Sequence, residues 1–384
     1  MSVEGWKTLL LGDISQFRYG KMPDKSLVTS EGDYPVFSGY RINGYYPKYN
    51  CEEERLIVVA GGVGGTGDVK INKEKCWLTN LSIEFFVDDD KASVTFLYYY
   101  FLKDTLRHLD SGSAQSQITI DDLKRIYIEL PDLPTQTRIA AILSALDDKI
   151  ELNRQTNATL EAIAQAIFKE WFVDFHFPGA TGEMQDSELG PIPKGWRVGK
   201  IGEICEVNKN TISKRDVFEQ IEYLEISGVN RGVISKTTIY SYGAEPSRAK
   251  RKLSHGDTVL STVRPNRGAY FLALNPSSTL IASTGFAVFS PITVPSSFLY
   301  LFLTASEQLE YYGHVADGGA YPAINSNLII DIDLVVPSTD VLNDFQSIVE
   351  SLFEALDNNN SQSTIIAQTR DVLLPKLMSG EIEV

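Results

Sequence analysis

"TQTRIAAILSALDDKIELNRQTNATLEAIAQAIFKEWF", residues 135–172, carries apolar side chains at steps of three and four. This spacing predicts one long amphipathic helix. Its apolar stripe consists of Ile139, Ile142, Leu146, Ile150, Leu160, Ile163, Ile167 and Trp171. Asn153 and Asn157 stand in the stripe where Leu or Ile is expected. Buried Asn is typical of a coiled coil with a fixed register, and a frayed surface helix is the alternative.

A second segment of the same design covers residues 339–374. Its stripe consists of Phe345, Ile348, Leu352, Leu356, Asn359, Ile366 and Val372 or Leu373. Alone, each helix would leave a whole apolar face in water, so we expect the two helices to pack against each other. Asn would then face Asn. At ~1.5 Å per residue each helix would be roughly 50–60 Å long.

The helices belong to a tandem repeat. Gly5, Trp6, Gly12 and Ile14 recur at an offset of 190 as Gly195, Trp196, Gly202 and Ile204. The segment 111–131, "SGSAQSQITIDDLKRIYIELP", matches 317–337, "DGGAYPAINSNLIIDIDLVVP", at an offset of 206. The residues between these anchors show little similarity. The chain is therefore a pair of similar frames around dissimilar interiors.

The two large segments have mixed composition. The β-branched runs 55–62 and 257–264 predict strands, and 94–109 and 296–312 predict helices that follow equivalent strands. The predicted class is α+β, with globular domains at 1–130 and 191–336. Segments 131–190 and 337–384 carry the long helices. A length of 384 residues suits two domains of ordinary size.

Composition excludes several classes of protein. No segment approaches 18 consecutive apolar residues, so no membrane span is expected, and the N-terminus lacks the features of a signal peptide. Three Cys and four His are too scattered for a disulfide framework or a metal site. We expect a cytoplasmic protein with no metal of its own.

The net charge of −15 is unevenly distributed. Lys and Arg minus Asp and Glu gives −4 for residues 1–130, −6 for 131–190, +1 for 191–336 and −6 for 337–384. The two short helical segments therefore hold most of the negative charge. Basic patches for nucleic acid remain compatible with the two nearly neutral domains.

Catalytic motifs are weak. "GVGGTG" (62–67) fits G-x-G-x-x-G after a strand, but the next residues, "DVKINKEKCW", alternate like another strand. A dinucleotide or S-adenosylmethionine site would need a helix there, so a glycine turn between strands is favoured. We find no phosphate loop, methyltransferase tetrapeptide or nucleophile elbow. The chain is predicted not to be an enzyme by itself.

Basic clusters indicate DNA binding more directly. "SRAKRKLSHGD" (247–257) contributes Arg248, Lys250, Arg251 and Lys252, and "STVRPNRGAY" (261–270) contributes Arg264, Asn266 and Arg267. Arginines beside Asn after a strand suit contacts to phosphates and base edges, although a solvated loop is the alternative. "SGYRINGYYPKY" (38–49) contributes Arg41, Asn43 and Lys48, with tyrosines that could instead pack the loop. Further candidates are Lys21, Lys70, Gln115, Arg231 and Tyr321.

The chain resembles the specificity subunits of type I restriction-modification systems over its full length. The resemblance is closest in 130–175 and in the C-terminal "TRDVLLPKLMSGEIEV" (369–384). "GSAQSQIT" and "YPVFSGYRINGYY" resemble the frame of one target recognition domain of that family. "LSTVRPNRGAYFLA" and "STGFAVF" resemble the frame of another. The family pattern has Glu-Gln where this chain has Thr135-Gln136.

The resemblance implies a non-catalytic subunit that recognises a split site in double-stranded DNA, one domain for each half. It implies that the long helices pair antiparallel and recruit two modification subunits, which methylate adenine with S-adenosylmethionine. Restriction subunits, which use ATP and Mg²⁺, can join the complex. No cofactor is expected in this chain. Two alternatives stay open, a methyltransferase that binds S-adenosylmethionine at Gly61–Gly67 and a coiled-coil adaptor that does not bind DNA.

Overall fold

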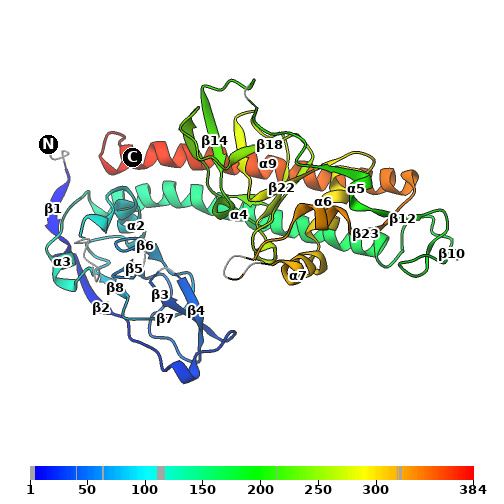
Figure 1. Ribbon diagram of the computed structural model, residues 1–384. Coiled ribbons are helices and arrows are strands. Elements are labelled where there is room, and N and C mark those ends of the chain that lie inside the picture. The colour runs from blue at the N-terminus through cyan, green and yellow to red at the C-terminus, as the bar shows by residue number, and fades with distance from the viewer. Residues whose placement is uncertain are drawn as a thin grey trace. The chain divides into compact units, whose positions relative to one another are not determined.

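The computed structural model describes residues 5–39, 41–62, 65–109, 117–213, 215–317, 319 and 322–384. The chain forms two compact units, and each is described by itself (Figure 1). Unit 1 combines Met1–Leu152 with Gln362–Val384, and unit 2 is Asn153–Ser361. Two 40-residue helices, α4 (Leu133–Phe172) and α9 (Thr339–Met378), each contribute one half to each unit.

Unit 1 is built around a four-stranded sheet in the order β2-β8-β5-β6, accompanied by the sheet β4-β3-β7 and the pair β1-β9. In chain order its elements are β1 (Lys7–Leu10), α1 (Leu11–Ile14), β2 (Ser15–Tyr19), η1 (Lys25–Leu27), β3 (Tyr34–Ser38), β4 (Arg41–Tyr46), β5 (Leu56–Val59), β6 (Val69–Ile71), β7 (Trp77–Leu78), β8 (Ser82–Val87), α2 (Val94–Lys103), η2 (Leu106–Leu109), α3 (Ile120–Lys124) and β9 (Tyr127–Leu130).

Strand β5 lies between two hydrophobic layers. Leu56 and Val58 join the main core of unit 1 with Phe96 of α2, whereas Ile57 joins a smaller core with Cys51 and Cys76. Successive strand residues point to opposite faces of a sheet, so a strand covered on both sides must be apolar throughout. This accounts for the uninterrupted sequence "LIVV" of β5.

Unit 2 contains two four-stranded sheets, β13-β22-β19-β20 and β17-β14-β21-β18, and the pairs β12-β23, β15-β16 and β10-β11. In chain order its elements are β10 (Met184–Gln185), β11 (Ile192–Pro193), β12 (Arg197–Lys200), α5 (Ile201–Ile204), β13 (Cys205–Val207), β14 (Gln220–Leu224), η3 (Ile226–Gly228), β15 (Val229–Asn230), β16 (Val233–Ile234), β17 (Thr238–Ser241), β18 (Ala249–Lys252), β19 (Asp257–Ser261), η4 (Pro265–Arg267), β20 (Tyr270–Ala273), β21 (Leu280–Ser283), β22 (Phe286–Pro291), α6 (Ser296–Thr304), α7 (Ser306–Val315), α8 (Ser326–Ile330) and β23 (Asp333–Val336).

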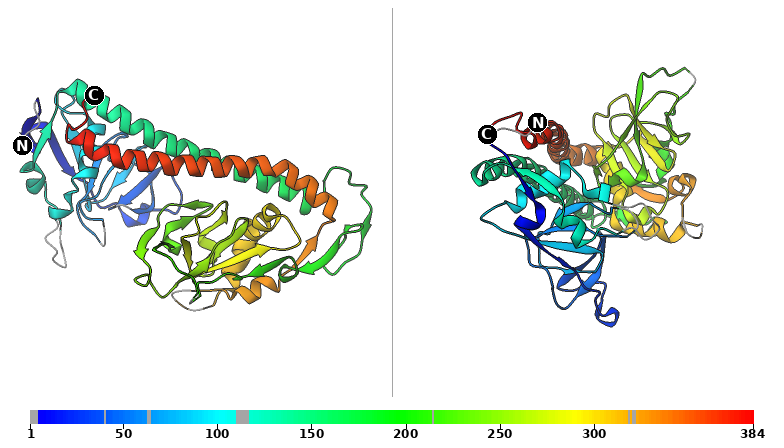
Figure 2. Two further views of the ribbon diagram at one scale, coloured as in Figure 1. Left: turned by 90° about the horizontal axis from the view of Figure 1, so that it is seen from above. Right: turned by 90° about the vertical axis from the view of Figure 1, so that its left-hand side faces the viewer.

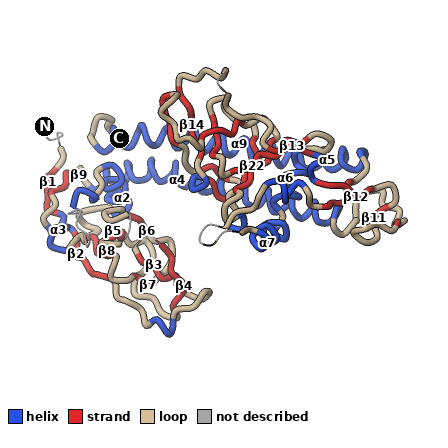
Figure 3. The backbone as a smooth tube through the Cα atoms, in the orientation of Figure 1, coloured by secondary structure: helices blue, strands red, loops and turns tan. Residues whose placement is uncertain are grey.

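The predicted repeat is confirmed element by element (Figure 3). β1-α1-β2 and β12-α5-β13 begin 190 residues apart, and α3-β9-α4 and α8-β23-α9 begin 206 residues apart. The sheets β2-β8-β5-β6 and β13-β22-β19-β20 have the same order of corresponding strands. The second sheets differ, with three strands in unit 1 and four in unit 2. The α+β class and the similar frames were therefore predictable, and the difference lies in the interiors.

The halves of α4 and α9 pack against each other within each unit (Figure 2). In unit 2 the rings of Phe172 and Phe345 lie 4.8 Å apart, near the end of α4 and the beginning of α9. In unit 1, Ile139 near the beginning of α4 shares a core with Leu377 near the end of α9. The order of contacts along the two helices is opposite, so the expected antiparallel pairing is confirmed.

The apolar stripe predicted for the helices is wrong in part. The stripe places Ile142, Ile163 and Ile348 on the buried face, but their side chains are exposed. Of the two alternatives at its end, Val372 is exposed and Leu373 is half-buried. The buried positions include Leu143, Ala164, Phe168, Val349 and Phe353. Each helix contacts both its partner helix and a globular core, which widens and rotates the buried face relative to a simple two-helix seam. The other predicted stripe residues are buried or half-buried, namely Ile139, Leu146, Ile150, Leu160, Ile167, Trp171, Phe345, Leu352, Leu356 and Ile366.

Asparagines form a polar layer between the helices in unit 2. The side chain of Asn157 donates to Oδ1 of Asn360 at 2.8 Å and accepts from Nδ2 of Asn359 at 2.8 Å. Nδ2 of Asn153 donates to the main-chain oxygen of Asn359 at 3.3 Å. Because buried amides must keep hydrogen-bond partners, the layer favours the one alignment in which these residues face each other.

Replacing Asn157 by Ala should lower the free energy of unfolding by about 1–3 kcal/mol, because it removes two hydrogen bonds between the helices, each worth about 0.5–1.5 kcal/mol. Chemical denaturation measures this difference. The matched control is Ala at exposed Thr159, which should change stability little. Equal stability of Asn157→Ala and the wild type would contradict the importance of the layer.

In the part of the chain that the structure describes, none of the helices has the length and hydrophobicity of a membrane span.

Candidate nucleic-acid interface

A tight arginine-bearing turn connects β19 to β20 in unit 2. Arg264 adopts a left-handed conformation with φ of 49°, and Gly268 closes the turn with φ of 78°. The main-chain N–H of Arg267 donates to the oxygen of Arg264 at 2.9 Å, and that of Arg264 donates to Pro322 at 2.8 Å. The turn is therefore ordered by main-chain hydrogen bonds, one within it and one to Pro322. We call residues 264–268 the arginine turn; Asn266 and Arg267 in it are exposed.

The structure brings Arg231 to the same place. Arg231 lies between β15 and β16, and its N–H donates to the oxygen of Gly268 at 2.7 Å. A Cβ added at Gly268 would lie only 2.9 Å from Cγ of Arg231. Glycine at this position therefore allows the Arg231 side chain to lie across the arginine turn. Four of the sequence candidates, Arg231, Arg264, Asn266 and Arg267, form one cluster.

Two further segments support the arginine turn. A Cβ at Gly313 of α7 would lie 2.9 Å from Cβ of Asn266, so α7 contacts the turn closely. Val263 forms a β-bridge with Ala323, and the N–H of Ile324 donates to Thr262 at 2.9 Å. The candidate Tyr321 precedes this bridge but lies outside the described residues, as does Gln115 in unit 1.

The basic cluster 248–252 is mostly a strand, so the alternative of a solvated loop is wrong for it. Lys250, Arg251 and Lys252 belong to β18 and are half-buried. Nζ of Lys252 lies 2.6 Å from Oδ1 of Asp216, and this hydrogen bond lowers the pKa of Asp216 to about 2. Lys252 is thus neutralised within the domain.

Arg248 is placed differently from its neighbours. It is exposed, and its main-chain oxygen accepts from the N–H of Thr284 at 2.8 Å. The next residue, Gly285, accepts from the N–H of Thr262 at 2.9 Å, at the base of the arginine turn. Arg248 is therefore connected to the arginine turn through a short turn between β21 and β22.

In unit 1 three of the candidates lie on or just after the β3-β4 hairpin. Arg41 and Asn43 on β4 and Lys48 just after it are exposed. Lys21 is exposed as well, and its main-chain oxygen accepts from Nε1 of Trp77 at 2.6 Å. The predicted alternative of packing tyrosines applies here too, because Tyr46 is buried with its ring 4.4 Å from that of Trp77. The hairpin combines an aromatic base with exposed polar side chains.

Lys70 is used inside unit 1. Its ammonium group lies 3.7 Å from the centre of the Phe37 ring and donates to the main-chain oxygen of Gly39 at 3.2 Å. Burial lowers the pKa of Lys70 from 10.5 to about 8. These contacts hold the β3-β4 hairpin.

The lowered pKa predicts a stability change with pH. Between about pH 8 and 10.5 the unfolded chain binds more protons at Lys70 than the folded chain, so stability should rise with pH in this window. Chemical denaturation of the wild type and Lys70→Met at both ends of the window measures the effect, and Met at exposed Lys73 is the control. The same pH dependence in wild type and Lys70→Met would contradict it.

The glycine turn of unit 1 corresponds to the arginine turn of unit 2. The N–H of Ile118 donates to Ala60 at 2.8 Å, as Ile324 donates to Thr262 in unit 2. The glycine turn joins the antiparallel strands β5 and β6, as the sequence predicts; Val63 and Gly64 within it lie outside the described residues. Strand β6, rather than a helix, follows this connection.

Arg107, which sequence analysis missed, lies beside the glycine turn. Its guanidinium binds both carboxylate oxygens of Asp68, at 2.7 and 3.0 Å. The two residues are 39 positions apart, and no local pattern connects them. In unit 1 the arginine beside the glycine turn is therefore Arg107 of η2, whereas in unit 2 the arginines belong to the turn itself.

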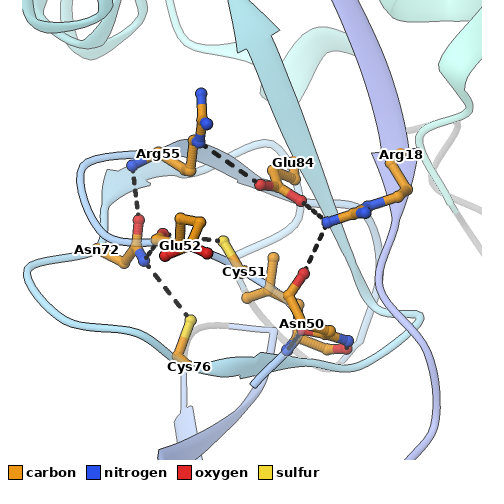
Figure 4. Close-up of polar contacts among 9 residues, drawn as sticks. Arg18, Asn50, Cys51, Glu52, Arg55, Asn72, Cys76 and Glu84 are labelled. Carbon is orange, nitrogen blue, oxygen red and sulfur yellow. Dashed lines mark hydrogen bonds and ion pairs between the residues drawn. The ribbon is translucent and has the colours of Figure 1, made fainter. Parts of the chain in front are cut away.

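A second missed cluster surrounds a buried carboxylate in unit 1 (Figure 4). Oε2 of Glu84 accepts from Nη2 of Arg18 at 2.6 Å, and its Oε1 lies 3.8 Å from Nε of Arg55. Both guanidinium groups lie over the Phe86 ring, at 5.0 and 5.4 Å. A buried charge needs such partners, so removing Arg18 would leave the Glu84 carboxylate poorly compensated.

Two thiols lie next to Glu84. Cys51 and Cys76 face each other across a β-bridge, and Nδ2 of Asn72 lies 3.7 Å from Sγ of Cys76. The neighbouring Cys76 thiol and burial raise the pKa of Cys51. Among the described residues, no three Cys, His, Asp or Glu side chains are grouped as metal ligands.

These features define a tandem-repeat protein with two α+β units on paired helices and an arginine cluster on one unit. The family model for the type I restriction modification DNA specificity domain matches residues 3–162 and 193–368, one match for each repeat. The chain belongs to this family. It is a specificity subunit of a type I restriction-modification system, a non-catalytic component of the complex.

Individual relatives agree with this assignment. The chain is 28% identical over 324 residues to the type I restriction enzyme MjaIX specificity subunit of Methanocaldococcus jannaschii, covering 80% of this chain and 73% of that protein. It is 25% identical over 373 residues to the HindI specificity subunit of Haemophilus influenzae, covering 79% and 81%. The crystal structure of a type I S subunit from M. genitalium has the same fold, with a TM-score of 0.58, 19% identity and coverage of 97% and 96%.

Proposed function

We propose that this specificity subunit binds double-stranded DNA and recognises a split site, unit 1 contacting one half and unit 2 the other. The observation that supports this most is the repeat of one frame around two different interiors. A shared frame suits one way of docking on a duplex, and different interiors suit two different half-site sequences. The arginine turn supplies side chains of the type that binds the guanine edge in the major groove and the phosphates of the DNA backbone.

The paired helices are proposed to set the distance between the half-sites and to recruit two modification subunits. The exposed apolar residues Ile142, Ile163, Ile348 and Val372 on these helices suit a protein partner. S-Adenosylmethionine would enter the complex with the modification subunits. ATP and Mg²⁺ would enter with restriction subunits where these join.

Reconstitution tests this function. The purified chain is combined with its modification subunits and S-adenosylmethionine, and methyl transfer to unmethylated host DNA is measured. Transfer should require both components and should occur at adenine in one split sequence. Transfer by the chain alone, with calorimetric binding of S-adenosylmethionine to it, would support a methyltransferase instead. Equal transfer without the chain would support an adaptor that does not bind DNA.

A further inference from the structure

A carboxylate from the long helix α4 reaches the candidate interface of unit 2. Oε1 of Glu161 accepts a hydrogen bond of 2.6 Å from the hydroxyl of Tyr300 on α6. Tyr300 is buried between the rings of Tyr270 and Phe353, with ring centres 6.1 and 5.9 Å away. Glu161 is thereby fixed in one orientation, with its second oxygen turned to another element.

That element is the turn between β15 and β16, which carries Arg231. A Cβ at Gly232 would lie 3.1 Å from Oε2 of Glu161 and 3.5 Å from the Tyr300 hydroxyl. The carboxylate of Glu161 therefore lies next to the space that a side chain at position 232 would occupy. The N–H of Gly232 donates to the main-chain oxygen of Tyr270, two residues after the arginine turn, at 2.8 Å.

The backbone of this region is held in an unusual conformation. Arg231 and Arg264 have φ of 38° and 49°, and they are two of the six non-glycine residues with positive φ among the described residues. Such conformations are uncommon for side chains with a Cβ, and they concentrate at functional sites where surrounding contacts hold them. Both strained arginines belong to the cluster proposed to contact DNA.

Keeping Glu161 charged at this position is unfavourable for folding. Burial raises the pKa of Glu161, while the Tyr300 hydrogen bond and the charge of Arg231 act in the opposite direction. A neutral residue of the same shape would avoid the desolvation of the charge. Buried groups with perturbed pKa values are retained at functional sites more often than elsewhere.

We propose that Glu161 is a positioning residue for DNA recognition, whose carboxylate holds the Arg231–Gly232 turn and, through it, the arginine turn. The inference rests on the proposed function, because it requires the arginine turn to contact DNA. It assigns to the long helix a direct role in shaping one recognition surface, in addition to pairing with α9.

The test uses Glu161→Gln in the full chain assembled with its modification subunits. Gln keeps the shape and an oxygen acceptor for Tyr300 but removes the charge. The variant should be at least as heat-stable as the wild type, yet its complex should bind DNA about 10-fold more weakly, an effect typical of coupled neighbouring groups. The loss should concentrate on the half-site of unit 2. Glu354→Gln, exposed on α9, removes the same charge and should leave binding unchanged.

The outcomes separate this inference from the proposed function. Wild-type affinity and sequence preference in Glu161→Gln would overturn the positioning role. A fall in melting temperature that parallels the weaker binding would also overturn it, because Glu161 would then be a structural residue. The double variant Arg264→Ala/Arg267→Ala is the reference. If that variant loses the half-site while Glu161→Gln keeps it, only the inference fails; if both bind as the wild type, the arginine turn is not the interface.

Discussion

Replacing Arg264 and Arg267 by Ala should abolish recognition of one half of the DNA site while the chain still folds and joins its modification subunits. Each good bidentate contact to a base is worth about 1–3 kcal/mol, so losing two should weaken binding of the specific site by about 30-fold or more. Competition binding with the intact site, and with sites altered in either half, measures the effect. The variant should tolerate changes in one half-site and still discriminate in the other.

The control for this variant removes the same charge from another part of unit 2. Lys194 and Arg197 form ion pairs with Glu183 and Glu203 at 2.9 and 2.7 Å. Replacing both by Ala should change binding little and leave the preference in both half-sites intact. Equal losses in the two double variants would show a general electrostatic effect rather than recognition by the arginine turn.

Lengthening both helices should change the spacing between the half-sites. The variant has seven residues inserted beside Asn153 in α4 and seven beside Asn359 in α9. Seven residues are close to two helical turns, so the asparagines of the two helices should still face each other. At ~1.5 Å per residue the insertions add about 10 Å, which corresponds to about three base pairs of a duplex if the helices run along it. The methylated motif should keep both half-sites and gain spacer.

Unequal insertion should have a more severe effect. Four residues in α4 alone move Asn157 out of line with Asn359 and Asn360 and break the hydrogen bonds of 2.8 Å that connect them. Recognition should then be lost or its spacing altered. An unchanged motif in both insertion variants would contradict the role of the helices as a spacer.

The frame of the fold was accessible from sequence because its signals are local or periodic. Identical residues at offsets of 190 and 206 predicted the repeat, and steps of three and four predicted α4 and α9. The exact buried face was not accessible, because Ile142 and Ile163 have the same spacing as core residues and only the tertiary contacts place them outside. Helical periodicity predicts that a face is buried, and the packed partners decide which residues are at its centre.

For the candidate interface, the sequence showed which segments are rich in arginine and lysine but not which of these side chains lie together. Arginine-rich segments 247–257 and 261–270 were visible, but their different fates depend on distant residues. Asp216 neutralises Lys252 from 36 positions away, and Arg231 reaches Gly268 from outside both segments. The contact of Glu161 with Gly232 joins a helix to a strand turn 71 residues later. Pairings of this length leave no periodic trace in one sequence.

The most direct measurement of the central claim is single-molecule sequencing of methylated bases in host DNA, with and without this chain. The account predicts one adenine-methylated motif made of two specific parts and a non-specific spacer, which disappears when the chain is removed. Arg264→Ala/Arg267→Ala should relax one of those parts only. Methylation that persists without the chain, or a single continuous motif, would contradict recognition by two different units.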